Sequence, residues 1–235
     1  MQHLEILPNL KEKTAIIYER IWLLEELEYL KESESYHVLA IDRRIYIKDD
    51  YVFTAMQGSS MIASLAERLI RAGVKRIIRI GTTGSLHDEH KLFEIIIPVA
   101  VYKDEGASAQ YIDDIFPCLC DFELSSMICD LLQGAGHTHY RGVTWTTDGR
   151  WVESLDKMHK LKKWGVLSVD METSALYTVC LLNKIPCTAL NFVSDFPMKS
   201  EKNGLRGIPD DYEIYKKELL RNVDKVTQLI VKGKI

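Results

Sequence analysis

The sequence predicts an α/β fold: a mixed, mostly parallel central sheet between layers of helices. Strand-like and helix-like segments alternate along most of the 235 residues, which is the pattern of parallel strands joined by helices. Residues 77–80 are apolar at three of four positions, as expected for a strand covered on both faces. We find no repeat or linker, so residues 1–235 are expected to form a single domain with a large core.

The first half of the chain is expected to supply strands and two helices. In order, we expect a strand at 14–18, a helix at 20–30, a strand at 36–41, a hairpin of 44–47 with 51–55, and a helix starting after Gly58-Ser59-Ser60. The hairpin turns at Asp49-Asp50 and makes the sheet mixed. The helix after Gly58 has an apolar stripe at helical spacing, follows a serine cap and ends at Gly73.

The second half continues the alternation. We expect a strand at 77–80, a turn at 81–84, a strand at 95–101, a loop at 103–118, a helix at 122–132, a strand at 143–147, a helix at 155–163, a strand at 166–169, an Ala/Leu-rich helix after 172 and a strand at 188–193. A polar loop then reaches about residue 210, and a long amphipathic helix closes the chain.

Composition excludes several classes of function. The net charge is −4 and the basic residues are dispersed, so we expect no nucleic-acid partner. No apolar run approaches the roughly 18 residues of a membrane span, and we expect neither a membrane partner nor a signal peptide. The five cysteines lie in apolar contexts without metal-ligand spacing. They are expected to be reduced core residues of a cytoplasmic protein without a metal site.

A possible anion site follows the strand at 77–80. Arg79 interrupts the apolar run, and Gly81-Thr82-Thr83-Gly84 reads as a turn with exposed backbone N–H groups and two hydroxyls. A guanidinium beside such a turn is suited to hold phosphate. The structural alternative is a buried salt bridge followed by an ordinary strand exit.

Acidic residues gather where other strands are expected to end. In Asp170-Met171-Glu172 two carboxylates flank a methionine at a strand-to-helix junction, where they either cap the helix or bind the hydroxyls of a ribose. Asp195 follows the apolar strand at 188–193 and is either a turn residue or a proton donor for a departing purine. Because ligands of such sheets collect at the carboxyl ends of the strands, we expect Arg79, Thr147-Asp148 and these acids to share one site.

Three motifs together resemble one family. Arg79-Ile-Gly-Thr-Thr-Gly84, Val169-Asp-Met-Glu-Thr173 and Val193-Ser-Asp195 are similar to motifs of the nucleoside phosphorylase family, which includes hexameric bacterial purine nucleoside phosphorylases, uridine phosphorylases and methylthioadenosine nucleosidases. The resemblance covers nearly the whole chain in order. The segment Gly58-Ser-Ser-Met61 is similar to that family's glycine-proline-serine turn.

The resemblance implies roles for particular residues. It makes Arg20, Arg79, Thr82 and, from a neighbouring subunit, Arg43 or Arg44 the phosphate ligands. It makes Asp195 the general acid, with Arg206 turning toward it, and Glu172 with Met171 the grip on the ribose. The remaining nucleoside-binding residues that it implies are His3, Thr83, Gly84, Arg150, Trp151 and Asp170. Inorganic phosphate is then a co-substrate, no other cofactor is implied, and a shared site requires a homo-oligomer, a dimer or a hexamer.

Two departures from the family pattern matter. The family's Gly-Asp-Pro-x-Arg loop is replaced by Ile16-Ile-Tyr-Glu-Arg20, in which only the arginine survives. Where purine-acting members place an aromatic residue against the base, this chain has Arg150 followed by Trp151, and either plane can stack on a base.

The reaction itself has alternatives. Hydrolytic relatives carry a glutamate after the first strand, and Arg20 falls at or beside its place, with Glu19 one residue earlier. Because Arg20, Arg79 and Thr82 suit a phosphate dianion, the sequence favours phosphorolysis of a purine ribonucleoside to base and ribose 1-phosphate. Hydrolysis, a uridine phosphorylase and a nucleoside-binding protein without catalysis are the alternatives. The sequence does not distinguish a 6-oxo from a 6-amino purine.

Overall fold

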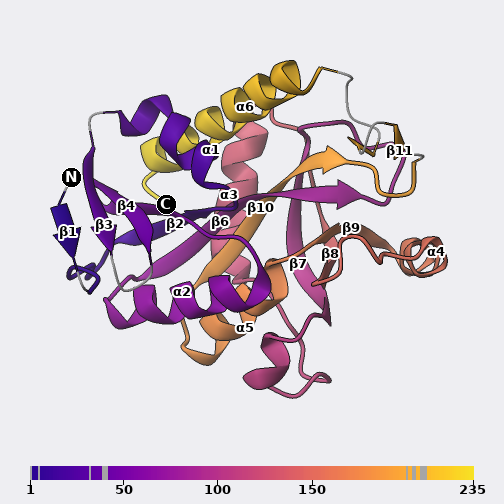
Figure 1. Ribbon diagram of the computed structural model, residues 1–235, viewed down its shortest axis with the longest axis horizontal. Helices are drawn as coiled ribbons and strands as arrows, with labels where there is room; N and C mark the ends of the chain where they lie inside the picture. Colours follow the sequence, from indigo (N-terminus) through magenta and orange to yellow (C-terminus); the bar gives the residue numbers. More distant parts are fainter. Residues whose placement is uncertain are drawn as a thin grey trace.

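A mixed sheet of ten strands forms the middle of the molecule, with helices on both faces (Figure 1). The computed structural model describes residues 2–4, 6–31, 33–38, 42–199, 201–202, 205–206 and 211–235; for 2–4, 201–202 and 205–206 the description covers the backbone. The sheet strands are β1 (Gln2–Leu4), β2 (Thr14–Tyr18), β3 (Glu34–Val38), β4 (Arg43–Lys48), β5 (Tyr51–Ala55), β6 (Arg76–Ser85), β7 (Ile95–Asp104), β8 (His139–Thr147), β9 (Val166–Asp170) and β10 (Cys187–Asp195). The short strands β11 (Glu201–Lys202) and β12 (Leu205–Arg206) pair separately.

The strand order is β1-β3-β4-β5-β2-β6-β10-β7-β8-β9, and β9 pairs back onto β6. Strands β2, β6 and β10 run parallel to one another, whereas β4 is antiparallel to β3 and β5. The mixed, mostly parallel sheet flanked by helices is therefore confirmed. The return of β9 to β6 closes five of the strands on themselves, which the sequence did not indicate.

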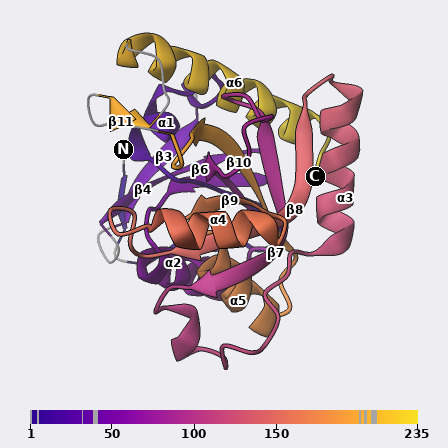
Figure 2. The ribbon, with the colours of Figure 1, turned by 90° about the vertical axis from the view of Figure 1, so that its right-hand side faces the viewer.

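The helices divide into two layers. Helices α1 (Ile21–Glu26), α3 (Phe122–Gly134) and α6 (Tyr212–Lys232) cover one face, whereas α2 (Ser59–Arg71) and α5 (Thr173–Leu182) cover the other (Figure 1). Each layer packs on its own apolar cluster, with alternate residues of β2 directed to each: Ile16 belongs to one and Ile17 to the other. Helix α4 (Leu155–Lys163) lies across the end of the sheet, in front of β9 (Figure 2).

Four expectations from the sequence need correction. The helix at 20–30 is broken at Leu27, whose backbone is extended, so that α1 is followed by a separate 3-10 turn at Glu28–Leu30. No serine caps α2; Gly58, with φ of 88°, is its N-cap residue. The strand β3 starts two residues earlier than expected, and residues 39–41 lie outside the described part.

The fourth correction concerns residues 81–84, which form no turn. Strand β6 continues to Ser85, because its backbone finds partners on both sides: Gly81–Gly84 pair with β10, and Gly84 and Ser85 pair with β9. Arg79 therefore lies in the middle of a ten-residue strand, not at its end. The parallel arrangement brings the carboxyl ends of β2 and β10 to the two sides of β6, and this edge holds the candidate site.

Candidate active site

Arg79 is the centre of a buried cluster of charges. Its side chain is 0% exposed and its guanidinium forms an ion pair with Glu172 and lies 3.5 Å from Asp170 Oδ2 and 3.9 Å from Glu19 Oε2. It also donates to the side-chain carbonyl of Asn191 on β10. A buried cation is tolerated when carboxylates surround it in this way, and these contacts raise the pKa of Arg79 despite its burial. We call Glu19, Arg79, Asp170, Glu172 and Asn191 the Arg79 cluster.

Gly81 makes room for this guanidinium. A Cβ atom on residue 81 would overlap the terminal nitrogens of Arg79, which folds back along its own strand. A glycine at this position is therefore required by close approach, not by an unusual backbone angle. The observed position of the Arg79 side chain thus depends on the absence of a side chain at residue 81.

Glu19 occupies the position expected for phosphate. It directly follows β2, is 5% exposed and accepts hydrogen bonds from the Thr82 backbone N–H at 2.6 Å and from the Thr82 hydroxyl. Arg20 Nε donates to its other carboxylate oxygen at 3.3 Å. Three of the predicted phosphate ligands, Arg20, Arg79 and Thr82, thus do converge, but they converge on a carboxylate of the protein itself.

Burial affects the acids of the cluster differently. Burial raises the pKa of Glu172 to about 7, with the charges of Glu19 and Asp170 acting in the same direction against Arg79. Burial alone would also raise the pKa of Glu19, but Arg20, Arg79 and the two Thr82 donors together hold it below its usual value. Glu19 is therefore ionised at neutral pH, whereas Glu172 titrates near it.

The junction between β9 and α5 positions Glu172 for a ligand. Its Oε1 atom accepts the Gly58 backbone N–H at 2.8 Å, from the start of α2. The Met171 carbonyl accepts from the Ser59 hydroxyl at 2.8 Å, which ties the same junction to α2. Two contacts from the start of α2 hold the Glu172 side chain and the preceding backbone, so its carboxylate is held at a defined place beside the cavity.

Asp170 is bound within the protein. Its carboxylate accepts from the Thr146 hydroxyl at 2.6 Å, from Asn191 Nδ2 at 3.1 Å and from the backbone N–H of Thr173 at 3.3 Å, and the Thr173 hydroxyl also donates to it. Asp170 thus satisfies the start of α5 and the interior of the sheet. Of the two acids in this motif, Glu172 is the one whose position suits a ligand.

Asp195 ends β10 on the far side of β6 from Glu19. Its side chain is 9% exposed and accepts the Ser194 hydroxyl at 2.8 Å, and Ser194 in turn lies 3.2 Å from the Thr83 carbonyl. Residue 84 is a glycine because a side chain there would overlap Pro197, which follows this strand end. The acid is therefore held against β6, facing the same edge of the sheet as Glu172.

A central cavity joins these groups. Its walls come from β6, from the ends of β9 and β10 with the residues that follow them, and from the segments after β2, before α2 and between β8 and α4. The lining residues are Glu19, Gln57, Thr82, Thr83, Gly84, Arg150, Glu153, Val169, Asp170, Met171, Glu172, Ser194, Asp195 and Pro197. Its volume of about 50 Å³ is too small for a nucleoside. Two larger cavities adjoin it, so a ligand of that size must extend into one of them.

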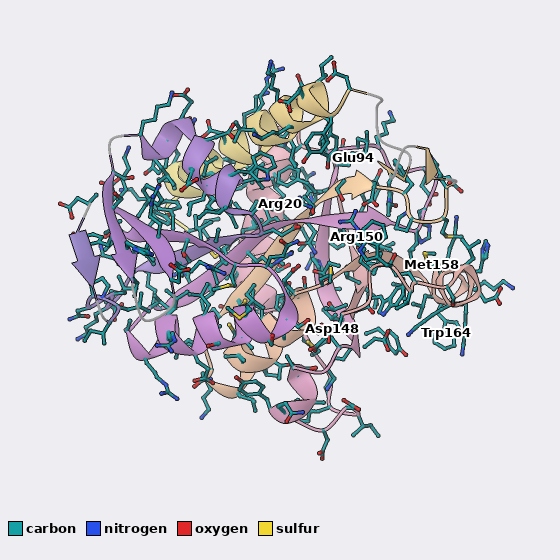
Figure 3. All side chains as sticks on the ribbon, viewed as in Figure 1. Arg20, Glu94, Asp148, Arg150, Met158 and Trp164 are labelled. Carbon is teal, nitrogen blue, oxygen red and sulfur yellow. The ribbon has the colours of Figure 1, made fainter. Side chains whose placement is uncertain are left out.

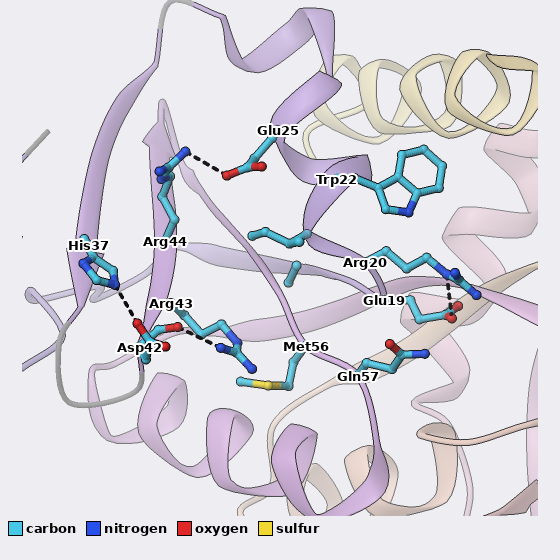
Figure 4. A pocket seen from close by; sticks show the side chains of 12 residues that line it. Glu19, Arg20, Trp22, Glu25, His37, Asp42, Arg43, Arg44, Met56 and Gln57 are labelled. Carbon is cyan, nitrogen blue, oxygen red and sulfur yellow. Dashed lines mark hydrogen bonds and ion pairs between the residues drawn. The ribbon is translucent and has the colours of Figure 1, made fainter. Parts of the chain in front are cut away.

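The outer cavity lies toward β4 and α1 and measures about 640 Å³ (Figure 4). Glu19 and Gln57 line both it and the central cavity. Arg44 lines the outer cavity, and one of its terminal nitrogens lies 2.8 Å from Glu25 Oε1. It therefore lies outside the Arg79 cluster of its own chain. On the same side of the outer cavity, where β3 pairs with β4 and His37 is the register partner of Arg44, His37 Nε2 lies 3.0 Å from Asp42 Oδ1.

The third cavity, which we call the α6 chamber, lies beneath the start of α6 and measures about 270 Å³. It is lined by Arg20, Trp22, Thr82, Arg150, Trp151, Ser194, Asp195, Tyr212, Tyr215 and Leu219. Four of these, Thr82, Arg150, Ser194 and Asp195, also line the central cavity. Arg20 and Arg150 lie near the middle of the molecule (Figure 3). The ring centroid of Trp151 lies 5.5 Å from the central carbon of the Arg150 guanidinium. Because Trp151 is 73% exposed, it forms the rim of the chamber.

Most residues implied by the resemblance therefore meet at one edge of the sheet. Arg20, Arg79, Thr82, Thr83, Gly84, Arg150, Asp170, Met171, Glu172 and Asp195 belong to the Arg79 cluster or to the cavities around it. Arg44 lies apart, and Trp151 lies at the rim. The side chains of His3 and Arg206 fall outside the described residues.

The sequence reasoning missed three participants. Glu19 was noted only as the neighbour of Arg20, although an acid directly after a buried strand carries the same signal as Asp195. Asn191 is a polar residue within an apolar strand, and this interruption was a second available signal. Tyr215 gave no signal, because a tyrosine on the apolar face of a long helix reads as core.

Comparison with known families agrees with this architecture. The family model described as the phosphorylase superfamily matches residues 9–231, so the chain belongs to this superfamily. The purine nucleoside phosphorylase DeoD-type of Buchnera aphidicola (Schizaphis graminum) is 28% identical over 57% of this chain and 58% of its own length. That of Colwellia psychrerythraea is 32% identical over 55% and 56%. The match spans little more than half the length of these curated relatives.

Solved structures share the fold. Uridine phosphorylase from Vibrio fischeri superimposes with a TM-score of 0.81 at 20% identity, covering 99% of this chain and 97% of that one. AMP nucleosidase from Bacteroides thetaiotaomicron superimposes with a TM-score of 0.74 at 24% identity, covering 95% and 91%. The same fold therefore carries proteins named for phosphorolysis and for hydrolysis. No helix in the described part of the chain is long and apolar enough to cross a membrane.

Proposed function

We propose that this protein cleaves the N-glycosidic bond of a purine ribonucleoside with water as the nucleophile, giving free base and ribose. The observation that supports it is the Glu19 carboxylate, which takes the Thr82 donors and the Arg20 contact that a phosphate ion would need. Membership of the phosphorylase superfamily supports the class of reaction.

The charges around the site favour water over phosphate. Three carboxyl groups, on Glu19, Asp170 and Glu172, face two guanidinium groups, on Arg20 and Arg79, so negative charge is in excess above the pKa of Glu172, which burial raises to about 7. A phosphate dianion would add to this negative charge in a buried place, where repulsion between like charges is strong. Water adds none, and an adjacent ionised carboxylate can accept its proton.

In the proposed mechanism the residues act on three parts of the substrate. Glu172 accepts the ribose hydroxyls, and these hydrogen bonds strengthen as the sugar becomes cationic. Glu19 accepts a proton from the water that attacks C1′, and Asp195 protonates the departing purine. The water oxygen forms the new bond to C1′ as the bond between C1′ and the base nitrogen breaks, so no metal or redox group enters the balance.

Phosphorolysis is the second candidate, and two observations favour it. Arg20, Arg79 and Thr82 converge as a phosphate site requires, and the similar curated proteins are purine nucleoside phosphorylases. In this case Glu19 must withdraw when phosphate binds. The products distinguish the candidates, because only phosphorolysis yields ribose 1-phosphate.

The test is a panel of purine and pyrimidine ribonucleosides, each incubated with and without inorganic phosphate. Hydrolysis predicts free base and ribose in both series, at similar rates. Release of base only in the presence of phosphate, with ribose 1-phosphate as the product, would establish phosphorolysis instead. Release of no base from any member would leave the chain as a nucleoside-binding protein.

A further inference from the structure

The α6 chamber contains hydrogen-bond donors that the mechanism above does not use. The Tyr215 side chain is only 8% exposed, yet its hydroxyl forms no hydrogen bond with any residue of the described ranges. Arg20 uses Nε for Glu19, and its two terminal nitrogens make no hydrogen bond within the same ranges. The Arg20 side chain is 32% exposed, and both residues line the chamber, so their donors are open to a ligand there.

The walls of the chamber suit a flat, aromatic ligand. Trp22, Tyr212 and Leu219 supply apolar and aromatic surface, and the Arg150 guanidinium offers a planar face at the junction with the central cavity. Aromatic rings and guanidinium planes stack on heterocyclic bases. The chamber is thus built for the base, whereas the central cavity beside Glu172 is built for the sugar.

Asp195 fixes how a purine would lie across the junction. The acid lines both cavities, and as the proton donor it faces N7 of the five-membered ring. In a purine, the substituent on C6 projects from the same edge as N7. It therefore points into the chamber, where Tyr215 and Arg20 offer hydrogen-bond donors. Burial raises the pKa of the Tyr215 phenol, which keeps the hydroxyl protonated.

We propose that Tyr215 and Arg20 recognise the C6 position of the leaving base and favour a 6-oxopurine over a 6-aminopurine. Arginine donates and cannot accept, so a C6 oxygen is matched and a C6 amino group is opposed. The inference rests on the proposed function for the placement of the base, and it assigns the substrate class that the sequence left open. A site built to pair with one group rejects the analogue that leaves its donors unpaired.

The experiment measures binding of free bases by calorimetry, without turnover. Hypoxanthine carries the C6 oxygen, adenine carries an amino group and unsubstituted purine carries neither. The unaltered protein should bind hypoxanthine more tightly than purine or adenine. Tyr215→Phe should lower the affinity for hypoxanthine about 2- to 12-fold, the contribution of one hydrogen bond. The affinity of the same variant for purine should stay within about twofold of that of the unaltered protein. Its ring packing against Phe93, at 5.4 Å between centroids, is retained.

A matched control is Tyr140→Phe, which removes a tyrosine hydroxyl bonded to Glu94 at 3.1 Å, outside the chamber. It should leave the affinity for all three bases unchanged. The proposal is overturned if the unaltered protein binds hypoxanthine no more tightly than purine, or if Tyr215→Phe weakens both equally or neither. The comparison of ligands in the unaltered protein remains decisive even if a variant folds poorly. Because no bond is cleaved, failure here is distinct from failure of the nucleoside panel.

Discussion

The Arg79 cluster and the α6 chamber lie on either side of the central cavity and satisfy their polar groups in opposite ways. In the cluster, Glu19, Asp170 and Glu172 each have several donors from the protein itself. In the chamber, Tyr215 and two nitrogens of Arg20 have no such partner among the described residues. The carboxylates of the first region already have partners in the protein, whereas we propose that the donors of the second take theirs from a ligand.

Under the proposed function, this difference accounts for water as the nucleophile at a motif that the resemblance assigns to phosphate. Arg79 and Thr82 are among the residues that the resemblance assigns to phosphate, but Glu19 already accepts hydrogen bonds from Thr82 and lies 3.9 Å from the Arg79 guanidinium. Under the proposed function, a carboxylate in that place favours water over an anion as the nucleophile. We expect substitutions in the cluster to change stability as well as activity, and substitutions on the chamber side to change activity alone.

The largest effect is expected on the chamber side. Asp195→Asn removes the proton donor and should lower kcat/KM for inosine by about 10²–10⁴-fold. The free energy of unfolding should change little by comparison. For a riboside whose leaving group needs no proton, such as p-nitrophenyl riboside, kcat/KM of the variant should fall much less. Near-normal release of hypoxanthine by the variant would contradict the role of Asp195 and remove the chamber's link to catalysis.

A smaller effect on the cluster side tests whether its geometry is fixed by packing. Gly81→Ala places a methyl group against the Arg79 guanidinium and should lower the free energy of unfolding by about 1–3 kcal/mol. The control is Gly134→Ala at the end of α3, where a Cβ meets nothing within 4 Å. The free energy of unfolding of that variant should rise by up to about 1 kcal/mol. Chemical denaturation measures both, and equal effects at the two glycines would show that Arg79 adjusts freely.

The pH dependence of activity should report Glu172. Burial raises its pKa to about 7, and the ionised form is the one that accepts both ribose hydroxyls. Lowering the pH through 7 protonates this carboxylate, so kcat/KM should fall toward tenfold per pH unit on the acidic side. The residual activity of Glu172→Gln should lack this fall. A profile of the unaltered protein that is flat from pH 5.5 to 8 would contradict the assignment.

Much of the fold followed from local pattern, because buried strands and amphipathic helices each have a recognisable period. The predicted turn at 81–84 failed for a physical reason: its glycines serve close packing against Arg79 and Pro197, not a change of chain direction. Two glycines three residues apart give the same sequence pattern whether they allow close packing or form a turn. The closure of β9 onto β6 depends on pairing between distant strands, which no local pattern encodes.

The candidate site was predicted in the same uneven way. Glu172 and Asp195 follow apolar strands, so the rule that ligands collect at strand ends found them. Asp170 satisfies the same rule, yet its oxygens are taken by Thr146, Thr173 and Asn191. Position along the sequence brings an acid to the site, but only packing decides whether it faces the ligand or the interior.

The most direct test of the account is the dependence of base release on phosphate in the unaltered protein and in Glu19→Ala. The unaltered protein should release hypoxanthine from inosine at a rate independent of phosphate, with ribose as the product. Glu19→Ala vacates the contacts with Thr82 and Arg20, so its low activity should rise with phosphate and yield ribose 1-phosphate. An unaltered protein that requires phosphate for any release of base would contradict the account.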